Sequence, residues 1–284
     1  MHIMLEPLNL NRRFGGISRL YGATGLNKLQ HSHVVVIGIG GVGSWAVEAL
    51  ARNAVGKITL IDLDNINESN VNRQIHALEG AFGKAKVSAM RERILAINPG
   101  CQVSEIEDFV KLDNIDKLLD FDCDVVLDCI DDTQAKIALA VYCRAQKIPL
   151  IMAGSAGGRL DPTRIKVADL SSVVGDRLLA KVRNQLRRDH QFPKNCGPEK
   201  TGFKLQSNKN SAQFAITCVY SDEQIIKPEI VNVQIKHFKS DDILEAKHAN
   251  AITGLNCAGY GSSVCVTAPF GFTAAQLAIN LIVA

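Results

Sequence analysis

Hydrophobic and polar residues follow each other along the first half of the chain in blocks of two kinds. Short apolar runs predict buried strands at residues 33–39, 57–62, 124–128 and 149–153, and the alternation over 101–109 predicts a further strand. Helical spacing predicts helices in the segments between these strands, after the glycine cluster that follows residue 39 and at 84–97, 114–119 and 132–146. Strands that alternate with helices predict an α/β fold with a doubly wound, mostly parallel sheet of Rossmann type.

The second half of the chain is less regular. Its patterns predict strands at 165–168 and 214–220, a basic helix at 176–188, a polar, mobile loop at 191–210 and an apolar helix from Gly259 to the end. We therefore expect one α/β domain with an N-terminal arm over 1–160, and an appended, smaller α+β region over 161–284. The final helix is expected to pack back on the core of the first domain.

Four glycines lie at the turn between the first predicted strand and its helix, within Gly38-Ile39-Gly40-Gly41-Val42-Gly43. Gly38 permits a tight turn, Gly40 allows a phosphate to approach the backbone, and Gly43 allows the helix to pack closely. Gly41 is the fourth candidate of this turn. The motif alone fits NAD, FAD, S-adenosylmethionine or ATP.

An acidic residue at the end of the second predicted strand adds a ribose site. Asp62 follows the glycines by about twenty residues, where a carboxylate accepts hydrogen bonds from ribose hydroxyls in this type of fold. Asp64 lies beside it in the sequence. The two features together predict a ligand that contains adenosine.

Further charged residues fall at the same predicted edge of the sheet. Arg73 lies in the polar segment Asn70-Val71-Asn72-Arg73-Gln74, Lys86 starts the next helix, and Asp131 and Asp132 follow the fourth strand. Such cations have little use in hydride transfer, but they neutralise a triphosphate, and an aspartate such as Asp131 holds Mg²⁺. The pattern therefore favours ATP with Mg²⁺ over a nicotinamide cofactor.

Composition excludes several classes of protein and leaves one charged district to explain. With 284 residues, 46% hydrophobic and 21% charged, the chain is not a disordered, collagen-like or coiled-coil protein. The net charge is only +3, yet residues 159–209 carry twelve Lys and Arg against five Asp and Glu. The remainder is therefore slightly acidic, and the basic district is the candidate surface for a polyanionic partner.

The eight cysteines do not form a recognisable disulfide or zinc pattern. They lie singly, several within apolar runs, and no Cys-x-x-Cys pair occurs. No secretory signal is visible at the start, so we expect reduced thiols in a cytoplasmic protein. The apolar segment 268–284 falls short of a membrane span and predicts a buried or interfacial helix, with membrane association as the less favoured alternative.

Over residues 11–160 the chain resembles the ubiquitin-activating-enzyme superfamily, whose members adenylate carboxylates. The matching residues are Arg13 and Arg19 of the arm, the glycine cluster, Asp62-Leu63-Asp64, Asn70-Val71-Asn72-Arg73-Gln74, Lys86 and Asp128-Cys129-Ile130-Asp131-Asp132. The resemblance implies that Asp62 binds ribose, that Asn70, Arg73 and Lys86 contact the phosphates, and that Asp131 binds Mg²⁺. It also implies a homodimer in which an arm arginine, Arg13 or Arg19, reaches the triphosphate.

Two branches of that superfamily compete. One activates the C-terminal glycine of ubiquitin-like sulfur carrier proteins and usually holds zinc between Cys-x-x-Cys pairs, which this chain lacks. The other, without zinc, dehydrates threonylcarbamoyladenosine in tRNA at the cost of ATP, through an acyl-adenylate of the threonine carboxylate. Segments 13–22, 72–78, 154–163 and 257–263 resemble the tRNA-modifying branch, so we expect that activity. A sulfur-carrier adenylyltransferase and, more remotely, a dehydrogenase or binding module remain the alternatives.

The basic district, a glycine-rich loop and two cysteines supply further candidate sites for a tRNA-modifying enzyme. The tRNA is expected to contact the helix at 177–188, which carries Lys181, Arg183, Arg187 and Arg188, and the loop at 191–210. The glycine-rich loop 154–163 is a candidate site for a monovalent cation. Cys196 and Cys257 are the cysteines to test for a covalent role, and proteins of a cysteine desulfurase system are candidate sulfur-transfer partners.

Overall fold

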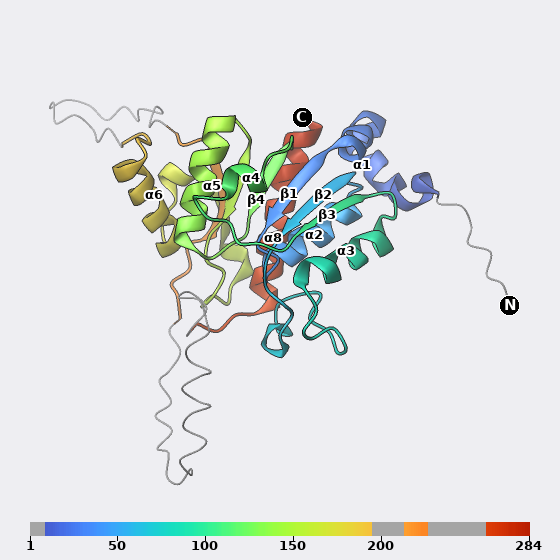
Figure 1. Ribbon diagram of the computed structural model, residues 1–284, viewed down its shortest axis with the longest axis horizontal. Helices are drawn as coiled ribbons and strands as arrows, with labels where there is room; N and C mark the ends of the chain where they lie inside the picture. The colour runs from blue at the N-terminus through green and yellow to red at the C-terminus, as the bar shows by residue number, and fades with distance from the viewer. Residues whose placement is uncertain (1–8, 195–212, 227–259) are drawn as a thin grey trace, which may run out of the picture.

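One seven-stranded sheet organises the molecule in the computed structural model, which describes residues 9–194, 213–226 and 260–284 (Figure 1). The strands are β1 (His33–Ile37), β2 (Lys57–Ile61), β3 (Gln102–Ile106), β4 (Val125–Asp128), β5 (Leu150–Ala153), β6 (Ile165–Asp169) and β7 (Ile216–Ser221). Their order is β3-β2-β1-β4-β5-β7-β6, and every pair is parallel except β6 with β7. The predicted doubly wound sheet is confirmed.

Helices cover both faces of the sheet. They are α1 (Leu10–His31), α2 (Gly43–Arg52), α3 (Lys86–Ile97), α4 (Ile115–Leu118), α5 (Thr133–Gln146), α6 (Arg177–Asp189) and α8 (Val264–Val283), with short 3-10 turns η1 (Glu68–Asn70), η2 (Pro162–Arg164) and η3 (Leu170–Ser172). Residues of α2, α3 and α8 share one buried cluster with the sheet, and residues of α4, α5 and α6 share the other. The arrangement is thus three-layered, as strands buried on both faces require.

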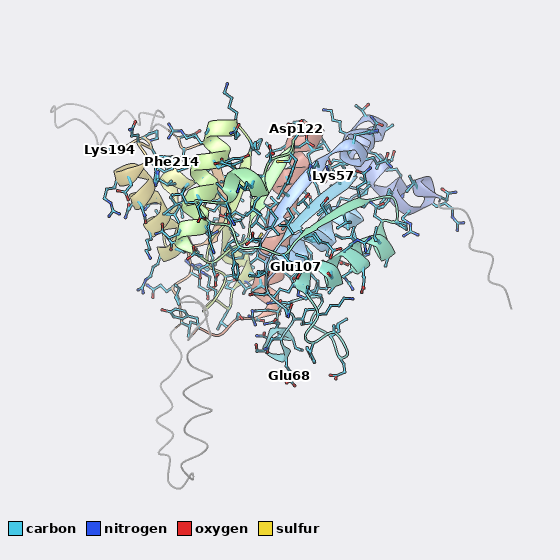
Figure 2. All side chains as sticks on the ribbon, in the orientation of Figure 1. Lys57, Glu68, Glu107, Asp122, Lys194 and Phe214 are labelled. Carbon is cyan, nitrogen blue, oxygen red and sulfur yellow. The ribbon has the colours of Figure 1, made fainter. Side chains whose placement is uncertain are left out.

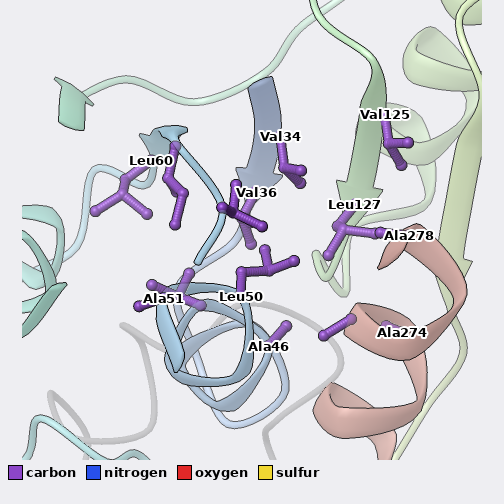
Figure 3. Close-up of a cluster of buried hydrophobic side chains, with 14 of the residues drawn as sticks. Val34, Val36, Ala46, Leu50, Ala51, Leu60, Val125, Leu127, Ala274 and Ala278 are labelled. Atoms are coloured by element: carbon purple, nitrogen blue, oxygen red, sulfur yellow. The ribbon is translucent and has the colours of Figure 1, made fainter. Parts of the chain in front are cut away.

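Alternation of side chains along the strands explains the two clusters. Val34 and Val36 of β1 point into the cluster beneath α2 and α8, whereas Val35 and Ile37 point to the opposite one. Figure 3 shows the first cluster, in which small residues of α2 and α8 meet the strands. All five residues of β1 are buried, which is why this strand reads as a continuous apolar run.

The C-terminal helix α8 closes the first cluster by lying against α2. Gly271 makes this possible, since a β-carbon there would stand 2.4 Å from the carbonyl oxygen of Val42 and 2.8 Å from the amide nitrogen of Ala46. By length and composition α8 is apolar enough to cross a membrane, but half of its most apolar window is buried within the protein. The predicted packing of the last helix onto the core is therefore what the structure has.

The predicted strands and helices of both halves are present, with ends shifted by a few residues. A boundary at residue 160 stays a prediction, because β6 and β7 from beyond it belong to the same sheet as β1–β5. Much of the predicted mobile loop lies outside the described residues, as do Cys196 and Cys257.

Candidate functional site

The glycine turn lies where the sheet reverses its strand order. β1 pairs with both β2 and β4, so the loops that follow β1 and β4 leave the same edge toward opposite faces, the place where such sheets bind ligands. Gly38 has φ +84°, and a β-carbon on it would stand 2.9 Å from the backbone of Cys129. A β-carbon on Gly43 would stand 1.8 Å from the carbonyl oxygen of Gly38, so the turn closes only with glycine at both positions.

Asp62 fixes the glycine turn to the end of β2. Its Oδ2 atom accepts the amide of Ile39 at 2.6 Å, and its Oδ1 atom accepts the amide of Asp64 at 2.9 Å. Burial raises the pKa of the Asp62 carboxyl, and the nearby Lys86 ammonium acts in the opposite direction. Asp62 therefore presents a buried carboxylate at the position expected for a ribose contact.

Lys86 joins this carboxylate from the first turn of α3. Its side chain is buried, with Nζ 2.6 Å from Oδ2 of Asp64 and 3.7 Å from Oδ1 of Asp62. The structure thus brings together the three predicted residues of this corner. In the structure this ammonium is paired with both carboxylates, which fixes its position beside the glycine turn.

Arg73 lies across the glycine turn from the segment that follows η1. A β-carbon on Gly41 would stand 3.2 and 3.3 Å from Cγ and Cδ of Arg73, so the stem of the arginine crosses directly above that glycine. Its Nη1 atom donates to the carbonyl oxygen of Ser69 at 2.8 Å and to Oδ1 of Asn72 at 3.0 Å. Asn70 is buried, and its Oδ1 atom accepts the amide of Asn67 in a capping box, so Asn70 holds the backbone of this segment.

The acidic residues at and after the end of β4 have different roles. Asp132 caps α5 by accepting the amide of Ala135 at 2.8 Å, and both Asp131 and Asp132 are exposed at the edge of the sheet. Asp128, at the end of β4, accepts the amide of Ile130 at 3.1 Å and so shapes the turn that carries Asp131.

A fully buried ion pair supports that turn. Nζ of Lys136 lies 3.0 Å from Oδ1 of Asp128 and donates to the carbonyl oxygen of Ala153 at 2.8 Å, with both side chains inaccessible to solvent. Burial raises the pKa of the Asp128 carboxyl, and Lys136 opposes the shift. Lys136 was not predicted as a site residue, although a lysine in the first turn of the otherwise apolar helix α5, eight residues after Asp128, is the signal that finds it.

Several buried polar atoms have no hydrogen-bond partner among the described residues, and two of their residues, Gln74 and Thr267, lie within 4 Å of a β-carbon placed on Gly40 or Gly41. They are Oε1 of Gln74, both ring nitrogens of His76, Oγ1 of Thr267 and Oδ2 of Asp128. Buried polar groups in folded proteins are nearly always satisfied. Unpartnered polar atoms beside a glycine cradle fit a site that receives a polar ligand.

The two arm arginines stand away from this corner within one chain. Nη1 of Arg13 donates to the carbonyl oxygen of Ile97 at 2.5 Å, at the opposite end of α3 from Lys86. Arg19 is exposed on α1 beside Gly15. Figure 1 places α1 at the end of the sheet opposite η1. The structure of one chain therefore does not bring either arginine to the glycine turn.

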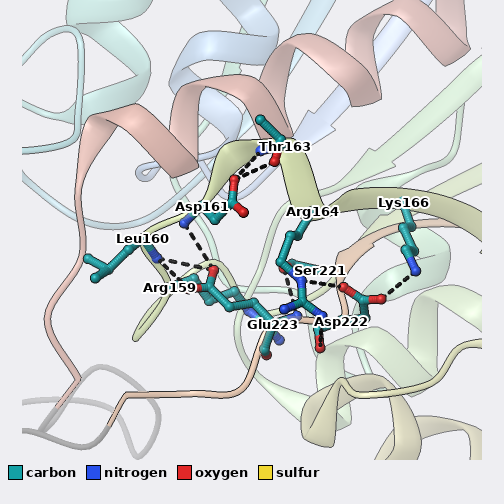
Figure 4. A network of polar contacts seen from close by, with 9 residues as sticks. All are labelled: Arg159, Leu160, Asp161, Thr163, Arg164, Lys166, Ser221, Asp222 and Glu223. Carbon is teal, nitrogen blue, oxygen red and sulfur yellow. Dashed lines mark hydrogen bonds and ion pairs between the residues drawn. The ribbon is translucent and has the colours of Figure 1, made fainter.

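The loop 154–163 is held by a network of polar contacts rather than lying free (Figure 4). The carboxylate of Glu223 accepts the amides of Leu160 and Asp161 at 3.1 Å, and Arg159 donates to the carbonyl oxygens of Ser155 and Glu223. Arg159 is only 1% exposed and lies 3.5 Å from Asp176, the N-cap of α6. This loop therefore connects the sheet edge at β5 with the start of the basic helix.

Helix α6 divides its cations between two faces. Arg177, Lys181 and Arg188 are exposed on one side, separated by helical spacing. Arg183 instead donates to the carbonyl oxygen of Val173, and Arg187 donates to that of Pro193 and lies over the ring of Phe214. Four cations were predicted on this helix, and of these Lys181 and Arg188 are exposed, as is Arg177. Arg188 also pairs with Asp189 at 2.8 Å. Lys194, at the edge of the described segment, is labelled near this helix in Figure 2.

The donor set at this edge agrees with a metal ion held mainly by phosphate. Among the described residues no group of three or more His, Cys, Asp or Glu side chains is placed to hold a metal ion. Mg²⁺ in nucleotide sites commonly takes one or two carboxylates together with substrate phosphates and water. Asp131, exposed at this edge, is the carboxylate predicted for that role.

Comparisons with known proteins extend over nearly the whole chain. The ThiF family matches residues 11–283. The tRNA threonylcarbamoyladenosine dehydratase of Haemophilus influenzae is 41% identical over 98% of this chain and 96% of its own length. The crystal structure of the Escherichia coli tRNA N6-threonylcarbamoyladenosine dehydratase in complex with ATP is 38% identical, with a TM-score of 0.79 over 98% of this chain and 97% of that one.

More distant similarity reaches the competing branch. The molybdopterin-synthase adenylyltransferase of E. coli is 32% identical over 51% of this chain and 57% of its own length. The similarity to the tRNA-modifying enzymes covers both halves of the chain, whereas the similarity to the sulfur-carrier branch covers about half.

Proposed function

The chain belongs to the ThiF family, and from that premise we propose that it catalyses the ATP-dependent dehydration of threonylcarbamoyladenosine in tRNA. The observation that carries the proposal is the convergence of Asp62, Lys86 and Arg73 on the glycine turn, in a chain similar to such dehydratases over its whole length. A relative of this chain binds ATP in its crystal structure, and another structure of that relative contains AMP. Both nucleotides are those that an adenylating reaction consumes and releases.

The reaction proceeds in two displacements. An oxygen of the threonine carboxylate attacks the α-phosphorus of ATP, the bond to the β-phosphate breaks, and pyrophosphate leaves. The carbamoyl group then attacks the activated acyl carbon, the bond to AMP breaks, and the carbamoyl nitrogen loses its proton. The carboxylate thereby loses one oxygen to AMP, so the nucleoside is lighter by one water.

The residues of the site act by charge and position. Arg73 and Lys86 neutralise the phosphates during the first displacement, when charge moves onto the leaving pyrophosphate. Asp62 holds the ribose, and Asn70 holds the backbone that carries Arg73. Mg²⁺, when bound through Asp131, supplies further neutralisation of the triphosphate. The second step needs no nucleophile from the protein, because the attack is intramolecular.

The exposed face of α6 serves as part of the tRNA-binding surface. Arg177, Lys181 and Arg188 form a positive stripe on a helix whose N-cap, Asp176, contacts the loop at the β5 edge. Phosphate contacts of this kind bind tRNA without reading its sequence and are sensitive to salt. The lysines of the predicted loop 191–210 are further candidates for tRNA contact, and residues 195–210 of that loop lie outside the described residues.

A homodimer, a monovalent cation at the loop 154–163 and sulfur-transfer partners complete the proposal. The dimer is favoured because Arg13 and Arg19 stand away from the glycine turn of their own chain. A cytoplasmic location is proposed, as expected for a tRNA-modifying enzyme, and docking of the apolar helix α8 on a membrane is the less favoured alternative.

One assay tests the activity. Purified protein is incubated with ATP, Mg²⁺ and tRNA that carries threonylcarbamoyladenosine, and the products are AMP and a nucleoside lighter by one water. Formation of AMP only with a carrier protein that ends in Gly-Gly would support the sulfur-carrier adenylyltransferase instead. No cleavage of ATP with either substrate would contradict both activities.

A further inference from the structure

The C-terminal helix contacts the segment that carries Arg73, although the two are about 190 residues apart in the sequence. Nδ2 of Asn72 donates to the carbonyl oxygen of Ser262 at 2.7 Å, and the amide of Val264 donates to the carbonyl oxygen of Asn72 at 3.2 Å. Both the side chain and the backbone of Asn72 are thus bonded to the residues at which α8 begins.

Asn72 also contacts the guanidinium itself. Its Oδ1 atom accepts from Nη1 of Arg73 at 3.0 Å, while Nδ2 points to Ser262. A single amide therefore bridges the predicted phosphate-binding arginine and the C-terminal segment. The orientation of Arg73 depends on where α8 begins.

A second connection runs through the only tryptophan of the chain. The indole nitrogen of Trp45 donates to the carbonyl oxygen of Arg73 at 2.9 Å, and its ring meets the ring of Phe272 edge-on at 5.8 Å. Trp45 belongs to α2, the helix that follows the glycine turn. Arg73, α2 and α8 are therefore joined at one aromatic contact.

A third contact lies on the glycine turn. A β-carbon on Gly41 would meet Arg73 at 3.2 Å on one side and Cγ2 of Thr267 at 3.4 Å on the other. Thr267, on α8, is buried, and its hydroxyl has no partner among the described residues. The first turns of α8 thus form one wall of the corner in which Arg73 stands.

We infer that Asn72 and the first turns of α8 are positioning elements of the ATP site, which hold Arg73 over the glycine turn before the nucleotide binds. This inference rests on the proposed function insofar as Arg73 contacts phosphate. Preorganisation of a charged side chain raises affinity because less ordering is required on binding. The C-terminal segment is accordingly part of the nucleotide site and not only a cover for the core.

Binding of ATP in the absence of tRNA tests the inference, with the fluorescence of Trp45 and calorimetry as readouts. Asn72→Ala removes both the bond to Ser262 and the acceptor of Arg73, and we expect ATP affinity to fall about tenfold, as the loss of one or two hydrogen bonds allows. In turnover assays the KM for ATP is expected to rise while the KM for tRNA is unchanged. Asn27→Ala, an exposed amide on α1, is the matched control and is expected to bind ATP as the native protein does.

A second variant keeps the test decisive if Asn72→Ala does not fold. Phe272→Ala removes the aromatic contact from a side chain that is 45% exposed, so folding is expected to persist. We expect it to weaken ATP binding by about threefold and to alter the fluorescence response of Trp45. Native ATP affinity in both folded variants, with or without a lower Tm, would overturn the inference. Absence of ATP binding by the native protein would instead contradict the proposed function.

Discussion

At the residue scale, the candidate site consists of carboxylates and cations that stabilise one another. The buried charges among them would be costly to bury without their partners. Lys86 is the clearest case, because its buried ammonium stands between Asp62 and Asp64. These positions were predicted from the end of a strand and the start of a helix, since both signals are local. Lys136 and Asn72 were not predicted as site residues, because their roles depend on contacts between segments far apart in the sequence.

Removal of the Lys86 charge is expected to abolish most of the activity. In Lys86→Met the triphosphate loses a buried counter-charge, and we expect kcat/KM for ATP to fall by about 10²-fold or more. Release of AMP measures the effect. Lys84→Met is the matched control: the ion pair of Lys84 with Glu92 is largely exposed, so its loss is expected to change little. Equal activity of Lys86→Met and native protein would exclude the assigned role.

His76 makes the stability of the fold depend on pH. Burial, followed by the charges of Lys86 and Arg93, lowers the pKa of His76 from 6.5 to about 4. Below pH 6.5 the unfolded chain binds a proton that the folded protein does not, so this contribution to stability is complete above pH 6.5 and falls as the pH drops toward about 4. The loss amounts to at most about 3 kcal/mol.

The variant His76→Gln isolates this contribution from that of His33, whose pKa burial also lowers. We expect the free energy of unfolding of the native protein to fall more steeply between pH 6.5 and about 4 than that of the variant, in urea titrations at several pH values. Parallel curves for the two proteins would show that His76 is not held neutral.

At the element scale, the loop 154–163 and helix α6 form one unit through Arg159. The sequence predicted the helix and its charge, but not that Arg183 and Arg187 face inward, because a helical pattern of cations does not reveal what packs above it. The backbone carbonyl oxygens of Val173 and Pro193 accept hydrogen bonds from these two side chains. The sequence predicted only an N-terminal arm where the structure has helix α1. The glycines at 15, 16, 22 and 25 interrupt the pattern from which a helix is predicted.

Loss of Arg159 is expected to destabilise the protein. Arg159→Met leaves buried carbonyls and the carboxylate of Asp176 without their cation, and the free energy of unfolding should fall by about 3 kcal/mol. Arg164→Met is the matched control, because its pair with Asp222 is half-exposed and contributes little to stability. Denaturant unfolding measures the free energy of unfolding of the two variants. Equal stability of the two would mean that the buried network of Arg159 does not stabilise the fold.

The exposed face of α6 is expected to bind tRNA. Reversing two charges in Lys181→Glu/Arg188→Glu should weaken tRNA binding by about tenfold or more and reduce its salt dependence, while ATP binding stays native. Filter binding at several salt concentrations measures this. Lys111→Glu/Lys117→Glu, a pair of exposed lysines at and before α4, has the same change in charge and is expected to have a smaller effect. Native tRNA affinity of the α6 variant would place the tRNA surface elsewhere.

At the scale of the whole molecule, the strand order explains why so much was predictable. The alternation of strands and helices predicted the parallel sheet, and the glycine turn after β1 predicted the edge at which a ligand binds. Both predictions rest on local sequence signals. The edge strand β6, which pairs antiparallel with β7, and the return of α8 onto α2 depend on packing between distant segments. The sequence predicted that the final helix packs on the core, but it holds no local signal for the helix that α8 contacts or for the antiparallel pairing of β6.

The arm arginines provide the test of assembly. If the proposed homodimer places an arginine of one chain in the site of the other, a dimer of one Arg19→Ala chain and one Lys86→Ala chain contains one complete site and one site that lacks both residues. Random mixing of equal amounts makes about half of the dimers mixed, so activity should return to about a quarter of the native value. The same experiment with Arg13→Ala identifies which arginine acts.

Within one chain Arg13 is bonded to the end of α3, away from Lys86, so an arginine that acted in its own chain would require a different arrangement of α1. In that case no mixed dimer contains a complete site, and activity would remain at the level of the separate variants.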